Sequence, residues 1–196
     1  MDILFYIVNT IFSILIVMMP LFLIVAYVTY SERKIIGFMQ SRMGPTRVGP
    51  SGLLQPIADV LKLVSKEIII PTNANKGIFL TAPMLMLIPS LLVWSVIPLS
   101  EYFIISNINA GLLFILALTS LSVYGVILAG WASNSKYAFL GSMRSAAQII
   151  AYEIAMGFAL VGVLMLSGSL NLQNIILAQS GTIFNWYWLP LFPLFI

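Results

Sequence analysis

The feature that most limits the fold of this chain is the length of its uncharged segments. From Ile3 to Ser31 no side chain is charged over 29 residues, and further uncharged segments span residues 77–100 and 102–135. A helix of the first length is about 43 Å long, whereas the hydrocarbon core of a bilayer is about 30 Å thick. Charged residues make up only 8% of the chain, against about 25% in soluble domains, and apolar residues make up 61%. We therefore expect an all-α integral membrane protein.

These segments predict a single membrane domain over residues 1–196 with four full transmembrane helices. The predicted helices span residues 3–31, 77–99, 111–131 and 145–166. The last apolar segment, residues 183–196, has 14 residues and is too short to cross a bilayer, so we expect the start of a fifth helix. A helix that ended inside lipid would leave its last carbonyl groups unpaired. We therefore expect one piece of a larger unit, whose remaining C-terminal half is supplied by a second chain or by further sequence.

The basic residues fall on one side of this arrangement. All nine Lys and Arg residues lie in the predicted connections 32–76 and 132–144, whereas residues 99–110 and 167–182 contain none. Four spans place the first two connections on one side of the membrane and the other two on the opposite side. Because inner loops carry the excess of Lys and Arg, we expect both basic connections inside and the N-terminus outside.

The first inner connection combines defined turns with an amphipathic surface helix. Gly44-Pro45 and Gly49-Pro50 predict turns, because proline fixes φ and glycine permits positive φ. Residues 53–66 have helical periodicity, with apolar residues on one face and polar residues, Asp59 among them, on the other. Such a helix is typical of an interfacial anchor, and basic loops commonly only set topology. A pure anchor needs neither the acids nor the turns, which favours a docking site.

Glu153 is the single charged residue between Ser145 and Ile196. It lies nine residues after Arg144, and therefore about 13 Å deeper along the fourth predicted helix. A carboxylate at that depth is costly unless it is paired or protonated, and intramembrane acids commonly mark proton pathways. Two interpretations follow: Glu153 belongs to a proton relay, or it forms a structural hydrogen bond with a polar group of a neighbouring helix.

The residue types that the chain lacks exclude several kinds of site. It contains no cysteine and no histidine, which excludes disulfides, thiolate metal sites, histidine-ligated haem and acid–base catalysis by histidine. We therefore expect no metal site and no bound cofactor in this chain, and any redox centre must belong to a partner. The net charge of +3, without a long basic segment, gives no indication of nucleic-acid binding.

Two sequence motifs resemble the chain 1 family of NADH:ubiquinone oxidoreductase, respiratory complex I. The first motif comprises Glu32-Arg33-Lys34, Gly37, Gln40, Arg42, Gly44-Pro45, Gly49, Gly52-Leu53-Leu54-Gln55-Pro56, Ala58-Asp59, Lys62-Leu63 and Lys66-Glu67. The second comprises Gly130-Trp131-Ala132-Ser133-Asn134-Ser135-Lys136-Tyr137-Ala138, Gly141, Arg144, Gln148 and Tyr152-Glu153. The resemblance covers nearly the whole chain. Members of that family continue beyond the fifth helix with an acidic loop and three more helices.

The resemblance implies a subunit of a proton-pumping enzyme that carries no redox centre of its own. Such subunits anchor the peripheral arm, adjoin other membrane-arm subunits, and form the quinone chamber with hydrophilic quinone-site and terminal iron–sulfur subunits. Ubiquinone would be the substrate, and iron–sulfur clusters, FMN and NADH would be held by partners. The residues implied along the quinone path are Arg33, Gln40, Arg42 and Asp59. Those implied in the proton relay are Glu32, Asp59, Glu67 and Glu153.

Other interpretations remain open from the sequence. The membrane subunit of an energy-converting hydrogenase-type complex shares this fold without needing to bind quinone. A transporter fragment would show an inverted repeat of broken helices, and no internal repeat is present. A structural anchor would need no functional acid. The lack of a presequence fits synthesis either in a bacterium or inside the organelle. The high hydrophobicity and isoleucine content favour the mitochondrial inner membrane, with the bacterial plasma membrane as the alternative.

Overall fold

The computed structural model describes residues 2–101 and 103–192, and within these ranges the regular secondary structure is all helical. Four helices are long and apolar enough to cross a membrane: α1 (Asp2–Met39), α3 (Lys76–Val93), α4 (Gly111–Ala132) and α5 (Lys136–Ser167). The predicted fold class, an all-α protein with four spanning helices, is confirmed. Contacts between residues divide the chain into two compact units, Met1–Ile69 and Ile70–Ile196. The segment between α2 and α3, residues 66–75, contains no helix or strand.

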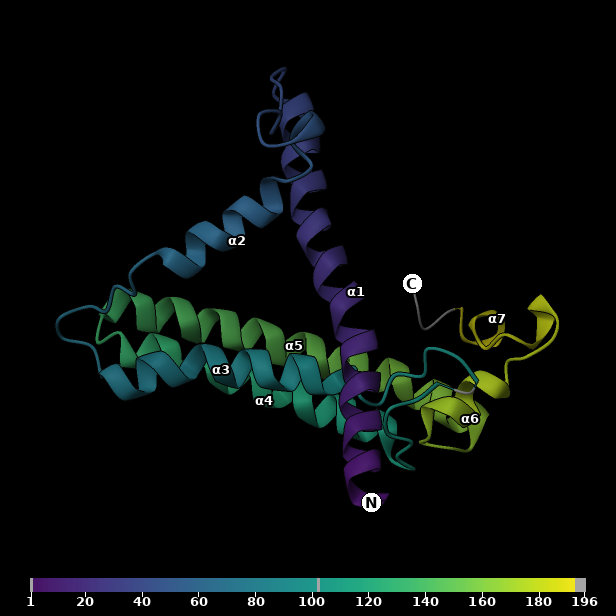
Figure 1. Ribbon diagram of the computed structural model, residues 1–196. Coiled ribbons are helices and arrows are strands. Elements are labelled where there is room, and N and C mark those ends of the chain that lie inside the picture. The colour runs from purple at the N-terminus through teal and green to yellow at the C-terminus, as the bar shows by residue number, and fades with distance from the viewer. Residues whose placement is uncertain (1, 102, 193–196) are drawn as a thin grey trace. The chain divides into compact units, whose positions relative to one another are not determined.

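The first unit consists of α1, a turn section and α2 (Gln55–Ser65) (Figure 1). α1 continues beyond its predicted end at residue 31, because Glu, Arg and Lys are good helix formers and the polar boundary does not end a helix. α2 is shorter than the predicted 53–66. It follows the short 3₁₀-helix Pro50–Gly52 and begins with Pro56 in its first turn, where the missing N–H group has no cost. It ends at Ser65 because the next residue is extended.

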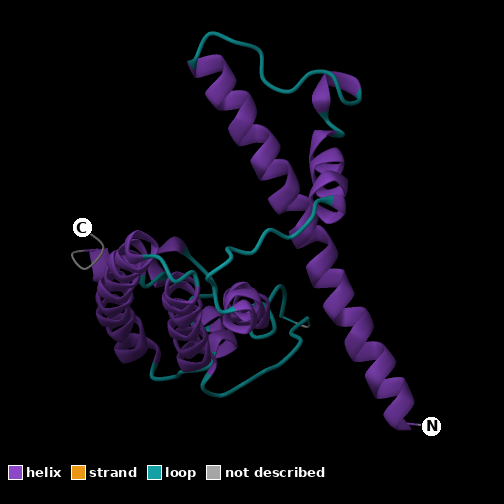
Figure 2. Cartoon of the chain, turned by 90° about the vertical axis from the view of Figure 1, so that its left-hand side faces the viewer, coloured by secondary structure: helices purple, strands orange, loops and turns teal. Residues whose placement is uncertain are grey.

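The second unit is built on α3, α4 and α5, which run antiparallel side by side with α4 in the middle (Figures 1 and 2). Glycines on α4 permit the close packing. A Cβ atom on Gly130 would lie 1.9 Å from Ser142 Oγ of α5, and one on Gly125 would lie 2.9 Å from Ala82 O of α3. Helices in lipid gain little from hydrophobic burial, so small interface residues that allow tight contact stabilise their packing.

Helix boundaries in the second unit differ in part from the predictions. α5 begins at Lys136 and not at residue 145, so the predicted inner connection 132–144 is reduced to a tight turn in which Asn134 has a φ of 50°. As in α1, the charged residues at the membrane boundary, Lys136 and Arg144, are part of the helix. α3 ends at Val93 and not at residue 99, and Pro98 disfavours helical backbone at Ile97, within the part that was predicted to be helical. α4 lies within one residue of the predicted 111–131.

The segment predicted to begin a fifth helix, residues 183–196, is not one continuous helix in its described part. After α6 (Leu172–Leu177), the chain forms a 3₁₀ turn over Ile183–Asn185, and α7 covers only Trp188–Leu191. Trp186 between them is extended, and the next backbone N–H group donates to Gln179 Oε1 at 3.3 Å instead of to a helical carbonyl. Residues 193–196 of the predicted helix lie outside the described residues.

The two ends of the three-helix unit differ in charge. At one end the Asn75 N–H group donates to Ala132 O at 2.9 Å, which places Lys76 and Lys136, the first residues of α3 and α5, at the same end. This is the polarity that the distribution of basic residues predicts for the inner side.

The opposite end is closed by uncharged side chains. The buried Asn171, 6% exposed, donates to Asn107 Oδ1 at 2.7 Å. Gln173 continues the network by donating to the backbone carbonyl of Glu101 at 3.1 Å. These bonds join the connection after α3 to the start of α6.

Candidate functional site

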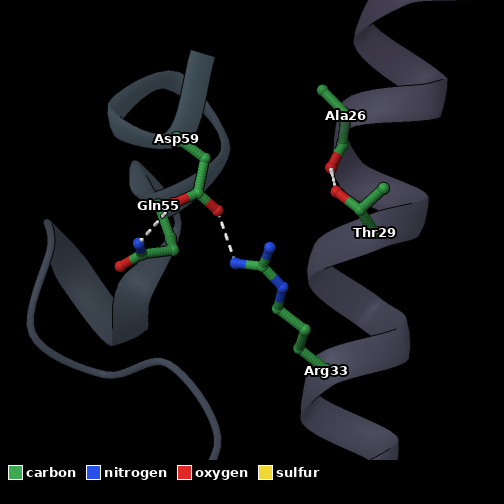
Figure 3. Close-up of polar contacts among 5 residues, drawn as sticks. All are labelled: Ala26, Thr29, Arg33, Gln55 and Asp59. Carbon is green, nitrogen blue, oxygen red and sulfur yellow. Dashed lines mark hydrogen bonds and ion pairs between the residues drawn. The ribbon is translucent and has the colours of Figure 1, made fainter. Parts of the chain in front are cut away.

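Arg33 of α1 and Asp59 of α2 form an ion pair within the first unit (Figure 3). Arg33 Nη1 donates to Asp59 Oδ2, and Gln55 Nε2, one turn earlier on α2, donates to Asp59 Oδ1 at 3.1 Å. The Arg33 side chain is 52% exposed and the Asp59 side chain 31%. Both carboxylate oxygens therefore have donors, and the pair joins two helices at an accessible surface.

The pKa of Asp59 lies below its ordinary value. The hydrogen bond from the Gln55 side chain lowers it most, followed by the hydrogen bond from Arg33. Both donors favour the ionised carboxylate. Asp59 is therefore a fixed negative charge at neutral pH, which suits it to hold Arg33 in place better than to exchange protons.

Arg33 and Arg42 border one pocket of about 430 Å³. The other residues that line it are Ile36, Met43, Gly44 and Pro45. Arg42 Nε donates to Gln40 Oε1 at 2.7 Å, so this arginine, like Arg33, is oriented by a neighbouring acceptor. The four residues expected on the quinone path thus form two hydrogen-bonded pairs, Arg33 with Asp59 and Arg42 with Gln40. The arginines of both pairs line the same pocket.

The turn section holds Arg42 against the end of α1. The backbone N–H group of Arg42 donates to Gly37 O at 2.9 Å, so it pairs one of the last carbonyl groups of α1. Further along, Gly52 has a φ of +83°, and a Cβ atom there would lie 2.2 Å from Pro45 O. Only glycine satisfies both this conformation and this contact. The geometry of the pocket therefore depends on a backbone turn as well as on its arginines.

Glu153 lies 17 residues after the start of α5, about 25 Å along the helix, and faces α4. Ser120 Oγ of α4 donates to Glu153 Oε2 at 3.0 Å. Both residues line a cavity of about 440 Å³. Its remaining lining residues are Leu116, Val123, Tyr124, Ile127, Ile150, Ile154 and Gly157. Among the described residues of this unit, no basic side chain forms an ion pair with Glu153.

The other two acids expected in the relay stand apart from these clusters. Glu32 lies on α1 and Glu67 follows α2, and both are exposed. In the described part of the first unit neither forms an ion pair or a side-chain hydrogen bond. The structure therefore joins Asp59 to the arginines but does not bring Glu32 or Glu67 into contact with them.

The comparison with known protein families bears on this arrangement. Residues 12–196 match the family described as NADH dehydrogenase. The chain belongs to this family. As a member of the NADH dehydrogenase family with four spanning helices, it is a multi-pass, complex I-type membrane subunit of an oxidoreductase complex, and other subunits of that complex are its partners.

Ser120, which donates to Glu153 in this NADH dehydrogenase subunit, was not predicted from the sequence. Ser120 belongs to a group of hydroxyl residues, with Thr119 and Ser122, in an otherwise apolar helix. Three hydroxyl residues close together in an apolar helix were the sequence feature that could have indicated a polar contact there. Sequence alone does not show which of the three hydroxyls faces α5, because this depends on how the two helices are rotated against each other.

Proposed function

We propose that this chain forms a wall of the quinone chamber in a proton-pumping NADH:ubiquinone oxidoreductase. The observation that carries the proposal is the pocket bordered by Arg33 and Arg42. A guanidinium group stays charged and presents several N–H donors, and a quinone oxygen gains negative charge as it is reduced. Two oriented arginines beside apolar walls suit a quinone head group that must bind neutral and be stabilised when it takes up electrons.

The electrons in this proposal come from outside the chain. Without cysteine or histidine, it offers no thiolate or imidazole ligand for an iron–sulfur cluster or haem. The clusters, FMN and NADH belong to hydrophilic partner subunits that dock on the basic inner side, and ubiquinone is the shared substrate. The location that we propose is the mitochondrial inner membrane, beside the other subunits of the membrane arm.

Protons in this proposal move through acids that are not tied to a cation. Glu153 meets this condition in mid-membrane, where its one donor is a neutral hydroxyl. Glu32 and Glu67 provide exposed carboxylates nearer the chamber side of the chain. Asp59, held ionised by Gln55 and Arg33, contributes a fixed charge to the route.

A matched pair of arginine substitutions tests the chamber. Arg42→Ala removes a pocket guanidinium, whereas Arg47→Ala removes the same charge from the same connection without lining the pocket. In the assembled complex, we expect Arg42→Ala to raise the KM for a short-chain quinone about tenfold, the effect of losing one charged hydrogen bond. Arg47→Ala should leave it unchanged. NADH oxidation by ferricyanide, which bypasses the quinone, should be normal in both. Equal KM values in the two variants would reject the chamber assignment.

A further inference from the structure

We propose that Tyr30 of α1 is a positioning residue for the pocket bordered by Arg33 and Arg42. Its hydroxyl group fixes the turn section, residues 40–54, and thereby the shape of the pocket. This inference rests on the proposed function and deepens it, because it names a group that controls quinone binding without lining the pocket.

One face of α1 makes the contacts with the turn section. Tyr30, Lys34 and Gly37 follow one another at spacings of four and three residues, which places them on the same face of the helix. A Cβ atom on Gly37 would lie 2.9 Å from Gly44 N, and one on Gly44 would lie 3.0 Å from Lys34 Cα. One turn earlier, the Tyr30 hydroxyl group donates to Ser51 O at 2.7 Å. This face therefore holds the turn section both near its beginning and near its end.

Ser51 is the point at which the turn section most needs a partner. Its φ of 54° and ψ of 18° lie in the left-handed region, which residues other than glycine seldom adopt. The next residue, Gly52, has a φ of +83°, so two successive residues have a positive φ. A backbone of this kind persists where its surroundings hold it. The hydrogen bond from Tyr30 holds it through the carbonyl group of Ser51.

Gly52 connects this hydrogen bond to the pocket. A Cβ atom on Gly52 would lie 2.2 Å from Pro45 O, so the two backbones are in direct contact. Pro45 lines the pocket together with Arg42. A displacement at Ser51 is therefore passed through Gly52 to the pocket wall.

The ring of Tyr30 is held separately from its hydroxyl group. Lys34 Nζ lies 5.7 Å from the centre of the ring, within the range of a cation–π contact. Tyr30→Phe keeps the ring and this contact and removes only the hydrogen bond. The variant therefore tests the hydroxyl group and not the packing of the ring.

Hydrogen exchange of the assembled complex, followed by mass spectrometry, tests whether Tyr30 holds the turn. The N–H groups of residues 52–54 are all bonded within the turn section. We expect them to exchange roughly fivefold faster in Tyr30→Phe, the effect of losing one neutral hydrogen bond. Tyr27→Phe is the control, because in the described part of the first unit the Tyr27 hydroxyl group forms no hydrogen bond. Equal exchange in the two variants would overturn the inference.

Quinone kinetics test whether the turn controls the pocket. We expect Tyr30→Phe to raise the KM for a short-chain quinone roughly fivefold, with an unchanged kcat and normal NADH oxidation by ferricyanide. A role in assembly alone would instead lower the kcat with the amount of complex and leave the KM as it was. Tyr27→Phe should behave like the natural chain. An unchanged KM in Tyr30→Phe would overturn the positioning role.

A second substitution tests the route through Ser51. Glycine adopts a positive φ without steric cost, so Ser51→Gly relieves the conformation that the Tyr30 hydroxyl group holds. Added to Tyr30→Phe, it should return the KM toward the natural value. Ser41→Gly relieves a similar φ of 55° elsewhere in the turn section and should not rescue the KM. No rescue, or equal rescue by both glycines, would show that Tyr30 does not act through Ser51.

The arginine variants separate this inference from the proposed function. If Arg42→Ala and Arg47→Ala have equal KM values, the pocket is not the quinone site, whereas the exchange of residues 52–54 still reports whether Tyr30 holds the turn. If Arg42→Ala raises the KM and Tyr30→Phe does not, the chamber assignment stands and the positioning role of Tyr30 is rejected.

Discussion

Asp59 in the first unit and Glu153 in the second are both carboxylates with hydrogen-bond donors, but the donors differ in charge. Asp59 accepts from the cation Arg33 and from Gln55 at an accessible surface. Glu153 accepts from the neutral Ser120 midway along an apolar helix and beside a cavity. A carboxylate paired with a guanidinium stays ionised and fixes geometry, whereas one held by a hydroxyl can gain or lose a proton and keep its partner. In the proposed function, this difference corresponds to positioning in the first unit and proton exchange in the second.

The largest effect should follow removal of the exchangeable acid. Glu153→Gln keeps the size and an acceptor for Ser120 but cannot carry a proton. We expect quinone reduction to fall on the order of a hundredfold, within the usual range for loss of a proton-transfer group, while the complex still assembles. Glu101→Gln is the control, because only the backbone carbonyl of Glu101 accepts a bond. Normal turnover and pumping in Glu153→Gln would remove the contrast between the two acids.

A backbone substitution in the first unit should have the next largest effect. Gly52→Ala forces a Cβ atom toward Pro45 O at a φ of +83°, and such strain costs on the order of 1–3 kcal/mol. We expect the amount of assembled complex on native gels to fall several-fold. Gly141→Ala, where the added atom meets nothing within 4 Å, should assemble normally. Equal assembly of the two variants would show that the turn geometry is not required.

Loss of the ion-pair charge should have a smaller effect on quinone binding. Asp59→Asn keeps the shape and the Gln55 contact but releases Arg33, so we expect the KM for a short-chain quinone to rise a few-fold. Because the two residues act as one pair, Arg33→Ala should add little in the Asp59→Asn background. Fully additive effects in this cycle would mean that Asp59 does not act through Arg33.

The smallest effect should be that of mild acid on the first unit. The pKa of Asp59 is lowered in the folded chain, so the stabilisation by its pairing is complete above the unfolded value of about 3.9. It is lost as the pH falls through the lower folded value. We therefore expect hydrogen-exchange protection of residues 40–54 to stay constant from about pH 7 to 5 and to fall only below about pH 4. Asp59→Asn should remove that fall, and loosening between pH 7 and 5 would contradict the assignment.

Parts of this arrangement could be predicted from the sequence because charge and apolar runs report depth in a membrane. The length of α4 and the position of Glu153 within an apolar helix follow from that pattern. The start of α5 could not be predicted in this way, since Lys136 and Arg144 mark the membrane boundary but are compatible with helix. Charge reports where the lipid ends, and the turn at Asn134 decides where the helix begins.

The side-chain partners were harder to predict than the helices. Arg33 and Asp59 are 26 residues apart, and only the family motif grouped them before the structure showed the pair. Their contact depends on turns such as the one at Gly52, whose close approach to Pro45 cannot be read from residue types. The partner of Glu153 depends on the rotation of α4, which an almost uniformly apolar helix does not reveal.

Infrared difference spectra of the assembled complex, recorded as quinone is reduced, compare the two acids most directly. The stretching band of a protonated carboxyl group reports a proton gained or lost by a side chain. We predict a band that changes during turnover, is absent from Glu153→Gln and is retained in Asp59→Asn. A band that persists in Glu153→Gln and disappears in Asp59→Asn would show that the ion-paired acid, and not the mid-membrane acid, exchanges the proton.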